Sequence, residues 1–326
     1  MAIYLVAGAA GFIGQRVSEL LMQEGHTVLG IDNLNDAYDV RMKYWRLNKL
    51  KSRHNFQFAQ LDISEFEPLY SWVSSTGQQI DAVINLAARA GVRQSVENPW
   101  IYVSTNEIGN LNLLEIARRN QIKKFILAST SSLYGANPPL PTPETAESDH
   151  PLQPYAASKK GAEAMCHSYH HLYGLDITVF RYFTVYGPVG RPDMVMFRFA
   201  KWVTEGNPVH ITGDGEQARG FTYIDDIARG TILGLRHVGY ELINLGGHEV
   251  VSMNRLLKMI EENVGKKAII EFIERHPADV MENCANVEKA KRILGWEPQV
   301  NLESGIRNLV NWYLQEREWA SQVKTP

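Results

Sequence analysis

Cysteine is scarce in this sequence, with two residues among 326. Cys166 and Cys284 lie far apart and show no spacing typical of a metal or redox site. Cys166 falls within a helical pattern, and we interpret it as a core residue. This cysteine usage predicts no metal site and favours a reducing compartment.

Long apolar runs and an excess of charge of one sign are also missing. The formal net charge is -3 without a run of one sign, which gives no support for a nucleic acid or membrane partner. No apolar run reaches transmembrane length, and the first residues lack the charged-then-apolar pattern of a signal peptide. We therefore expect a cytoplasmic globular protein.

A glycine-rich turn is present near the start of the chain. Residues 2–7 form an apolar run that predicts a buried strand, and an amphipathic pattern after the turn predicts a helix ending at Gly25. A second predicted strand, 26–31, ends at Asp32. This order of strand, turn, helix, strand and acid is typical of a dinucleotide-binding unit.

The residues of this unit have separate physical roles. Gly8 permits the tight turn, Gly11 lets the backbone approach a pyrophosphate, and Gly14 lets the helix pack on the strand. The helix N-terminus offers N–H groups to the phosphates. Asp32 lies where an acid binds the adenosine ribose, and it would repel a 2′-phosphate. The sequence therefore favours NAD over NADP.

Alternating strand and helix patterns continue to about residue 187 and predict a parallel, doubly wound Rossmann-type α/β sheet, with ligands at the carboxyl ends of its strands. Asp62 and Ile63 follow one strand, at a position suited to the adenine end of the cofactor. The small residues of the run 87–89 follow another, where backbone lies close to the cofactor ribose. The predicted strands are 56–61, 82–86 and 124–128, and the predicted helices are 66–73, 98–119 and 155–173.

Tyr155 and Lys159 are the centre of the expected chemistry. Four residues apart on a helix, they share one face, and a nearby ammonium lowers the pKa of a phenol so that it acts as an acid-base at neutral pH. The run 129–134 places hydroxyls at the carboxyl end of a strand, at the ligand crevice. Asn106 is either a polar residue on a helix shoulder or a brace beneath the tyrosine.

Two other regions have a broader interpretation. The basic segment 33–55 is chiefly a solvated helix and loop, with the alternative that some of its bases close over an anionic ligand. We expect 1–187, with later returning segments, to bind NAD, and 188–326 to form mainly a smaller, interleaved α/β substrate domain. The helices predicted there are 194–204, 227–235, 252–264 and 302–319, and the strands are 209–212 and 221–224.

These motifs together resemble the extended short-chain dehydrogenase/reductase superfamily, in its nucleotide-sugar epimerase and dehydratase branch. The similarity continues through the runs 181–188, 219–226 and 286–296, so it covers essentially the whole chain. The runs 31–36, 38–41, 90–93, 97–99 and 190–194 resemble UDP-glucuronate 4-epimerases, which interconvert UDP-glucuronate and UDP-galacturonate.

The resemblance implies a mechanism. Tyr155 acts at the sugar C4 hydroxyl, Lys159 lowers the tyrosine pKa and binds the nicotinamide ribose, and Thr130 hydrogen-bonds the C4 oxygen. Hydride passes from C4 to NAD, the 4-keto sugar rotates, and the hydride returns to the other face. The cofactor ligands that the resemblance implies, besides Tyr155 and Lys159, are Gly8, Gly11, Phe12, Ile13, Gly14, Asp32, Asn33, Asp62, Ile63, Leu86, Ala87, Ala88, Arg89, Asn106 and Tyr182.

A 4-keto uronic acid readily loses CO2, so an epimerase must hold the substrate carboxylate in an orientation that disfavours the loss. Arg191 or Arg93 would supply charge, although each is equally well explained as a surface cation or a structural salt bridge. Arg219 is implied for the diphosphate and Asp279 for the uridine ribose. The expected hydrogen-bonding ligands of the carboxylate are Ser131, Ser132 and Thr184.

Two positions depart from the family pattern. Gly220 follows Arg219 where the family usually has aspartate. The run 275–279 also differs from the usual sequence, and His276 either replaces a polar contact or is exposed. Both departures concern nucleotide binding rather than the class of reaction.

Other functions remain as alternatives. The same scaffold supports neutral UDP-hexose epimerases and UDP-glucuronate decarboxylases, and also non-catalytic NAD-binding regulators. Related 4,6-dehydratases carry an Asp-Glu pair, and decarboxylases keep a glutamate, where this chain has Ser131 and Ser132. Hydroxyls are poor acid-bases, so both are disfavoured. Regulators tend to lose the tyrosine or lysine, and this chain retains both.

Two helices, 98–119 and 155–173, carry apolar residues beyond one face. In this superfamily such a pair forms a four-helix dimer interface, while the alternative is burial within one subunit. We expect a homodimer.

Overall fold

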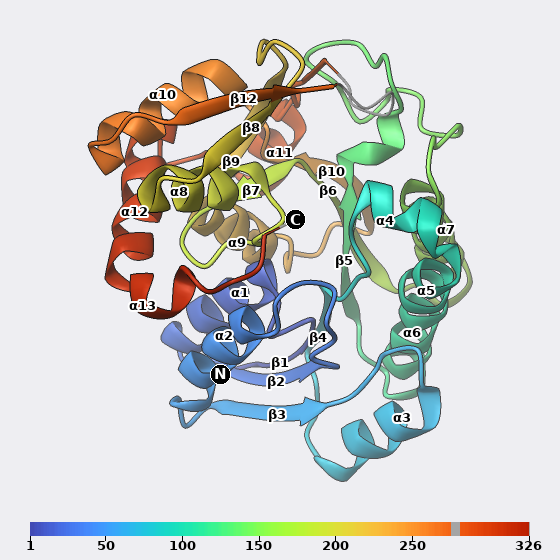
Figure 1. Ribbon diagram of the computed structural model, residues 1–326. Coiled ribbons are helices and arrows are strands. Elements are labelled where there is room, and N and C mark those ends of the chain that lie inside the picture. The colour runs from blue at the N-terminus through green and yellow to red at the C-terminus, as the bar shows by residue number, and fades with distance from the viewer. Residues whose placement is uncertain (275–280, 326) are drawn as a thin grey trace.

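The computed structural model describes residues 1–274 and 281–325, and its centre is a seven-stranded parallel sheet (Figure 1). The strand order is β10-β6-β5-β4-β1-β2-β3, and every neighbouring pair is parallel. This confirms the predicted doubly wound sheet. The strands are β1 Ile3–Ala7, β2 Thr27–Asp32, β3 Phe56–Gln60, β4 Ala82–Asn85, β5 Lys124–Thr130, β6 Asp176–Tyr182 and β10 Tyr240–Leu245.

Helices cover both faces of this sheet, which explains why its central strands are continuous apolar runs. Apolar residues of α1, α9 and α11 pack on one face, and those of α3, α6 and α7 pack on the other. Helix α2 packs against α1. The bounds are α1 Phe12–Gln23, α2 Arg41–Lys51, α3 Phe66–Ser75, α6 Gly109–Arg119, α7 Pro154–Tyr173, α9 Ile224–Leu233 and α11 Glu288–Leu294.

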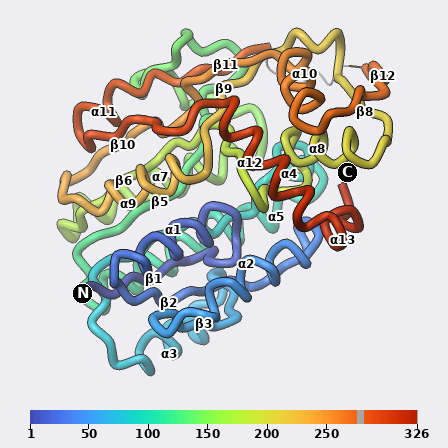
Figure 2. The backbone as a smooth tube through the Cα atoms, turned by 90° about the vertical axis from the view of Figure 1, so that its left-hand side faces the viewer, coloured from blue at the N-terminus to red at the C-terminus, as the bar shows by residue number. Residues whose placement is uncertain are grey.

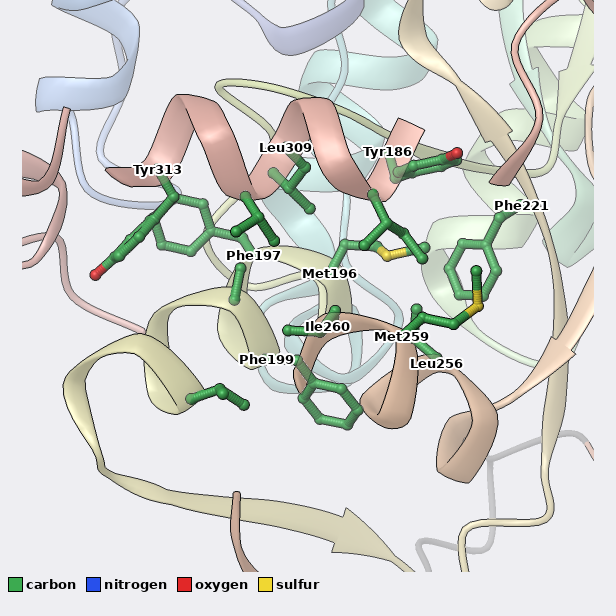
Figure 3. Close-up of a cluster of buried hydrophobic side chains, with 14 of the residues drawn as sticks. Tyr186, Met196, Phe197, Phe199, Phe221, Leu256, Met259, Ile260, Leu309 and Tyr313 are labelled. Atoms are coloured by element: carbon green, nitrogen blue, oxygen red, sulfur yellow. The ribbon is translucent and has the colours of Figure 1, made fainter. Parts of the chain in front are cut away.

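The later part of the chain builds a second layer around its own apolar core. Three amphipathic helices, α8, α10 and α12, bury their apolar faces together, as Figure 3 shows for Phe197, Ile260 and Leu309. The helices are α8 Val195–Glu205, α10 Met253–Val264, α12 Leu302–Gln315 and α13 Arg317–Ala320. The strands are β7 Thr184–Tyr186, β8 Pro208–Thr212, β9 Ala218–Tyr223, β11 Glu249–Ser252, β12 Ile269–Ile273 and β13 Glu282–Asn283, which form sheets of four strands (β11, β9, β13 and β7) and two (β8 and β12).

The two halves of the chain exchange segments. Strand β10 comes from the second half and completes the main sheet beside β6. The carboxyl-terminal residues return to α2, where the indole rings of Trp45 and Trp319 stack with centroids 6.2 Å apart (Figure 2). Segments from each half of the chain therefore pack within the other half.

Two predicted helices are interrupted. The helix predicted over 98–119 is α5 Pro99–Tyr102, a π-helical turn η1 Val103–Ile108, and then α6. The helix predicted over 302–319 ends at Gln315, and α13 follows as a separate turn. A short helix α4, Val92–Glu97, precedes α5, and a 3-10 turn η2, Ser131–Tyr134, follows β5. None of the helices within 1–274 and 281–325 is long and apolar enough to cross a membrane.

Candidate active site

The glycine turn lies at the carboxyl end of β1, where the sheet order reverses between β1 and β4. Gly8 has φ +79°, and a Cβ there would lie 2.7 Å from the backbone nitrogen of Ala87, just beyond β4. A Cβ on Gly14 would lie 2.0 Å from the carbonyl oxygen of Gly8. Side chains are therefore excluded from this turn, and none of the described side chains caps the N-terminus of α1. The arrangement suits a bound diphosphate.

Acidic groups beyond β2 and β3 lie near that turn. Asp32 is buried, and its carboxylate accepts hydrogen bonds from Ala10 N at 3.2 Å and Leu34 N at 2.8 Å. Lys43 Nζ lies 3.4 Å from the same carboxylate. Asn33 Nδ2 donates to Asp62 Oδ2 at 2.7 Å, and hydrogen bonds from Ser64 and Asn33 outweigh burial to lower the pKa of Asp62. These residues occupy the expected adenosine end of the cofactor site.

Tyr155 lies in the first turn of α7, which begins with Pro154. Burial raises the pKa of Tyr155, while a hydrogen bond with Thr130 and the positive charge of Arg191 oppose this rise. The structure therefore brings together Tyr155, Thr130 and Arg191, three of the predicted site residues. Tyr102 packs edge-on against Tyr155 with ring centroids 6.1 Å apart. The phenol thus contacts an aromatic ring and a hydroxyl, and the charge of Arg191 acts on it.

Lys159 lies one turn further along α7 and is 2% exposed. Burial lowers its pKa to about 8, although the nearby carboxylate of Glu163 favours the ammonium. Glu163 is itself buried and accepts from Arg181 Nε at 3.0 Å and Arg181 Nη2 at 2.8 Å. The lysine therefore belongs to a buried charged layer beneath the tyrosine.

The π-helical turn places Asn106 as a brace. Its side chain accepts from Arg89 N at 2.8 Å and donates to Arg89 O at 3.0 Å. It also donates to Ser158 Oγ at 2.9 Å, and that hydroxyl donates to Tyr155 O at 2.8 Å. Asn106 thereby connects the segment after β4 with the first turn of α7. Of the two readings, the brace is the one that the structure supports.

The strand-end hydroxyls line a cavity of about 120 Å³. Ser131 and Ser132 belong to this lining, with Phe183 and the pair Glu282 and Asn283 on the other side. The Thr130 hydroxyl accepts from Ser132 N at 3.1 Å, which fixes the start of the turn. Glu282 brings a carboxylate to the cavity from a distant part of the sequence.

Arg191 and Arg198 both interact with Asp193. Arg191 donates to Asp193 Oδ1 at 3.1 Å and Oδ2 at 2.5 Å, and Asp193 outweighs burial to raise the pKa of Arg191. Burial and, more weakly, the charge of Arg93 lower the pKa of Arg198, while Asp193 opposes this. Arg198 Nε is buried without a hydrogen-bond partner in the part of the chain that the structure describes. Asp193 therefore acts electrostatically on both Arg191 and Arg198.

The remaining predicted residues lie apart from this group. Arg219 donates to the carbonyls of Ala218 and Met281 at 2.8 and 3.1 Å. The Tyr182 hydroxyl is bonded to Thr231 Oγ1 at 2.8 Å, on the α9 side of the sheet. Thr184 is partly buried in β7. Asp279 and His276 lie outside the described residues.

Gly220, one of the two departures from the family pattern, has a structural explanation. A Cβ there would lie 2.1 Å from the carbonyl oxygen of Gly247, in the segment that leads into β11. An aspartate would therefore force the two segments apart. The backbone N–H of Gly220 donates a hydrogen bond to Asn283 Oδ1 at 3.0 Å.

A family model described as GDP-mannose 4,6 dehydratase matches residues 5–309 of this chain. The chain belongs to this family. The match spans the glycine turn, Tyr155, Lys159 and Arg191, so it includes the site described above. The carboxyl-terminal residues that pack on α2 lie outside it.

Relatives in this family include sugar-nucleotide epimerases. The chain is 55% identical to a UDP-glucuronate 4-epimerase of Thermodesulfobacterium geofontis, over 99% of this chain and 100% of the relative. A UDP-glucuronic acid 4-epimerase of Bacillus cereus, solved with UDP-glucuronic acid and NAD, is 35% identical with a TM-score of 0.89, over 96% and 99% of the two chains. A UDP-glucose 4-epimerase of Thermotoga maritima, solved with UDP-glucose, is 34% identical with a TM-score of 0.89, over 97% and 99%.

Sequence reasoning missed several charged residues of the site. The interpretation of segment 33–55 as chiefly solvated is wrong for Lys43 and Arg46, which are 5% and 0% exposed. The sequence pattern includes Asp193 only within a motif and does not indicate Arg198. The helical spacing of residues 43, 46 and 47 was a usable signal, because it places both bases on the side of α2 that carries buried Leu47.

Proposed function

We propose that this protein is an NAD-dependent UDP-glucuronate 4-epimerase that produces UDP-galacturonate through a 4-keto intermediate. The observation that carries the proposal is the cation near the acid-base: the positive charge of Arg191 acts on buried Tyr155, which also hydrogen-bonds Thr130 at the strand end. The 55% identity to a UDP-glucuronate 4-epimerase over nearly the whole chain supports the same substrate.

The residues fit NAD as the cofactor. The side-chain-free turn at Gly8 and Gly14 leaves room for a diphosphate against the start of α1, and Asp32 is placed for a ribose without a 2′-phosphate. Asn33 and Asp62 would lie at the adenosine end, and Lys159 at the nicotinamide ribose. When bound, NAD accepts the C4 hydride and later returns it.

The side chains of the site then transfer the proton of the C4 hydroxyl and hold the sugar ring. Tyr155 as phenolate takes the proton of the C4 hydroxyl while the hydride leaves C4 with its electron pair, and it returns the proton after the ring has turned. Thr130 hydrogen-bonds the C4 oxygen, and Arg191 favours the phenolate because a nearby positive charge stabilises a developing anion.

The substrate carboxylate must be held throughout, because a 4-keto acid loses CO2 when the carboxylate is aligned with the ketone. Arg191 presents a planar fork that binds and orients a carboxylate. Ser131, Ser132 and Thr184 would supply the remaining hydrogen bonds. Asp193 already accepts from Nε and Nη2 of Arg191, so Nη1 would be the donor to the substrate carboxylate.

Proton NMR of purified protein with UDP-glucuronate and NAD tests the proposal. We expect UDP-galacturonate signals and no pentose. UDP-pentose or a 4-keto pentose would show that the carboxylate is unprotected. Turnover of UDP-glucose alone would place the enzyme with the neutral-sugar epimerases. The TM-score of 0.89 with the Thermotoga maritima UDP-glucose 4-epimerase equals that with the Bacillus cereus UDP-glucuronic acid 4-epimerase.

Replacing the acid-base gives a sharper test. We predict that Tyr155→Phe lowers kcat by about 10²–10⁴-fold, the usual contribution of a positioned acid-base, while bound NAD is retained because the glycine turn is untouched. Tyr44→Phe, at a tyrosine that is 48% exposed, is the matched control. Unchanged turnover in Tyr155→Phe would contradict the mechanism.

We also propose a division of labour within the chain. The first 187 residues, with β10 and α11, would hold NAD, and residues 188–326 would mainly hold the UDP moiety through Arg219 and Asp279. The enzyme would work in the cytoplasm, which both free cysteines support. It would assemble as a homodimer through a four-helix bundle of α7 and the helical segment 99–119 from each subunit.

A further inference from the structure

Arg46 is a fully buried cation between the glycine turn and the segment before Arg191. At one end, Nη1 donates to the carbonyl oxygen of Ala10 at 3.3 Å and to the Tyr38 hydroxyl at 2.7 Å. At the other end, Nε and Nη2 donate to Val189 O at 3.1 and 2.6 Å, and Nη2 lies 3.4 Å from Gly190 O. One guanidinium therefore spans both loops.

The acceptors of Arg46 are neutral. Among the described residues they are three carbonyls and one phenol, and the rings of Phe12 and Tyr38 lie 5.8 and 5.5 Å from the guanidinium carbon. The carboxylate of Asp32, which accepts from Ala10 N, is paired with Lys43 instead. A buried charge is costly unless it is balanced. An anion on the glycine turn would supply that balance.

The segment that Arg46 holds is strained. Val189 is buried and has φ +58°, a conformation that is costly for a β-branched residue, typically by about 1–3 kcal/mol. The two donors on its carbonyl stabilise this conformation and hold the backbone in place. Arg191 follows two residues later, so the anchor lies immediately before the cation whose charge acts on Tyr155.

We propose that Arg46 is a positioning residue that fixes the 189–190 backbone against the glycine turn, places Arg191 beside Tyr155, and lends its charge to the cofactor diphosphate. The proposal deepens the proposed function and rests on it. A residue of the cofactor layer thus controls how the substrate carboxylate is held, without touching the substrate.

A double-mutant cycle tests the positioning role. We compare kcat/KM for UDP-glucuronate in the holoenzyme, Arg46→Met, Arg191→Met and the double variant. Arg46→Met should lose at least about tenfold, and the double variant should be within about twofold of Arg191→Met, because residues that act through one another are non-additive. Arg53→Met, at an exposed arginine just after α2, is the control and should match the wild type.

Product composition gives a readout that a loss of stability would not change. If Arg191 is displaced, the carboxylate is held less well, so the ratio of pentose to UDP-galacturonate in the NMR assay should rise in Arg46→Met and in Arg191→Met alike. That ratio does not depend on how much protein is folded. Multiplicative losses in the double variant with an unchanged ratio would overturn the positioning role.

Two further measurements keep the test decisive. If Arg46→Met does not fold, Arg46→Lys enters the same cycle, since an ammonium keeps the charge but lacks the fork that reaches both loops. Lack of turnover by the wild type contradicts the proposed function rather than this inference. In that case NAD binding is measured by calorimetry. We expect Arg46→Met to bind NAD about tenfold more weakly than Arg53→Met does, a difference of about 1.4 kcal/mol. Equal affinities of the two variants would overturn the inference.

Discussion

Tyr155 and Lys159 share one helix face, but the electrostatics around them differ from the simple expectation for a tyrosine–lysine pair. Arg191 and Thr130 are the groups that lower the pKa of Tyr155, against the larger effect of burial. Lys159 is itself buried enough for its pKa to fall to about 8. The helical spacing predicted the shared face correctly because it depends only on residues on one helix.

The buried Lys159 should make stability depend on pH in the NAD-free protein. Its pKa is about 8 when folded and near 10.5 when unfolded, so between these values the unfolded chain binds more protons. The free energy of unfolding should therefore rise with pH across this window, relative to Lys159→Met, by on the order of 3 kcal/mol. Urea denaturation of both proteins between pH 7.5 and 10.5 measures the difference. Parallel pH dependences would contradict the prediction.

Arg46 shows which residues a sequence cannot reveal. It donates to backbone carbonyls 36 and 143 positions away in the sequence. Every residue has a backbone carbonyl, so no residue type in the sequence indicates these acceptors. Gly8, Asp32 and Tyr155 were predictable because their chemistry depends on a local turn, a strand end or one helix. Arg198 and Glu282 were missed because only tertiary contacts bring them to the site.

The π-helical turn is the element whose departure from prediction affects the site most. The apolar stripe over 98–119 gave no sign of it, because η1 has only six residues and α6 resumes the regular pattern. The extra residue in this turn directs Asn106 inward, to Arg89 and Ser158. Such turns are often found at functional sites.

Removing the Asn106 side chain should therefore weaken the fold and the cofactor site together. Asn106→Ala deletes three hydrogen bonds and leaves buried partners unpaired, so we expect a loss of about 2–4 kcal/mol in the free energy of unfolding. NAD binding should weaken as well, because the backbone of Arg89 is no longer fixed. Asn120→Ala, at the exposed end of α6, is the control. Wild-type NAD affinity in Asn106→Ala, measured by calorimetry, would show that the brace is only structural.

On the scale of the whole molecule, α4 to α7 form one side of the protein and carry exposed apolar residues (Figure 1). Trp100 is 81% exposed and Leu172 is 65% exposed. Isolated exposed apolar residues are normal, but several on adjoining helices favour an interface. This pattern supports the proposed homodimer, in which the same helices of a second subunit would cover these residues.

Trp100→Glu should accordingly convert the proposed dimer to monomers. A charge buried in an apolar interface is costly, and aromatic residues often contribute most to binding. Phe272→Glu is the control, since Phe272 is 63% exposed on β12, away from α4–α7 (Figure 1). Sedimentation velocity at micromolar concentration measures the mass of each. A monomeric wild type, or a dimeric Trp100→Glu, would contradict the proposed interface.

The return of β10 to the main sheet has a consequence for how the protein is made. Strand β6 ends at Tyr182, but its outer neighbour begins at Tyr240, so the ribosome must release a long stretch of chain before that edge is paired. Until then β6 is an open edge, the kind of surface on which unfinished chains associate with one another. The first half of the chain therefore depends on the second to cover this open edge and so to limit association of unfinished chains during synthesis.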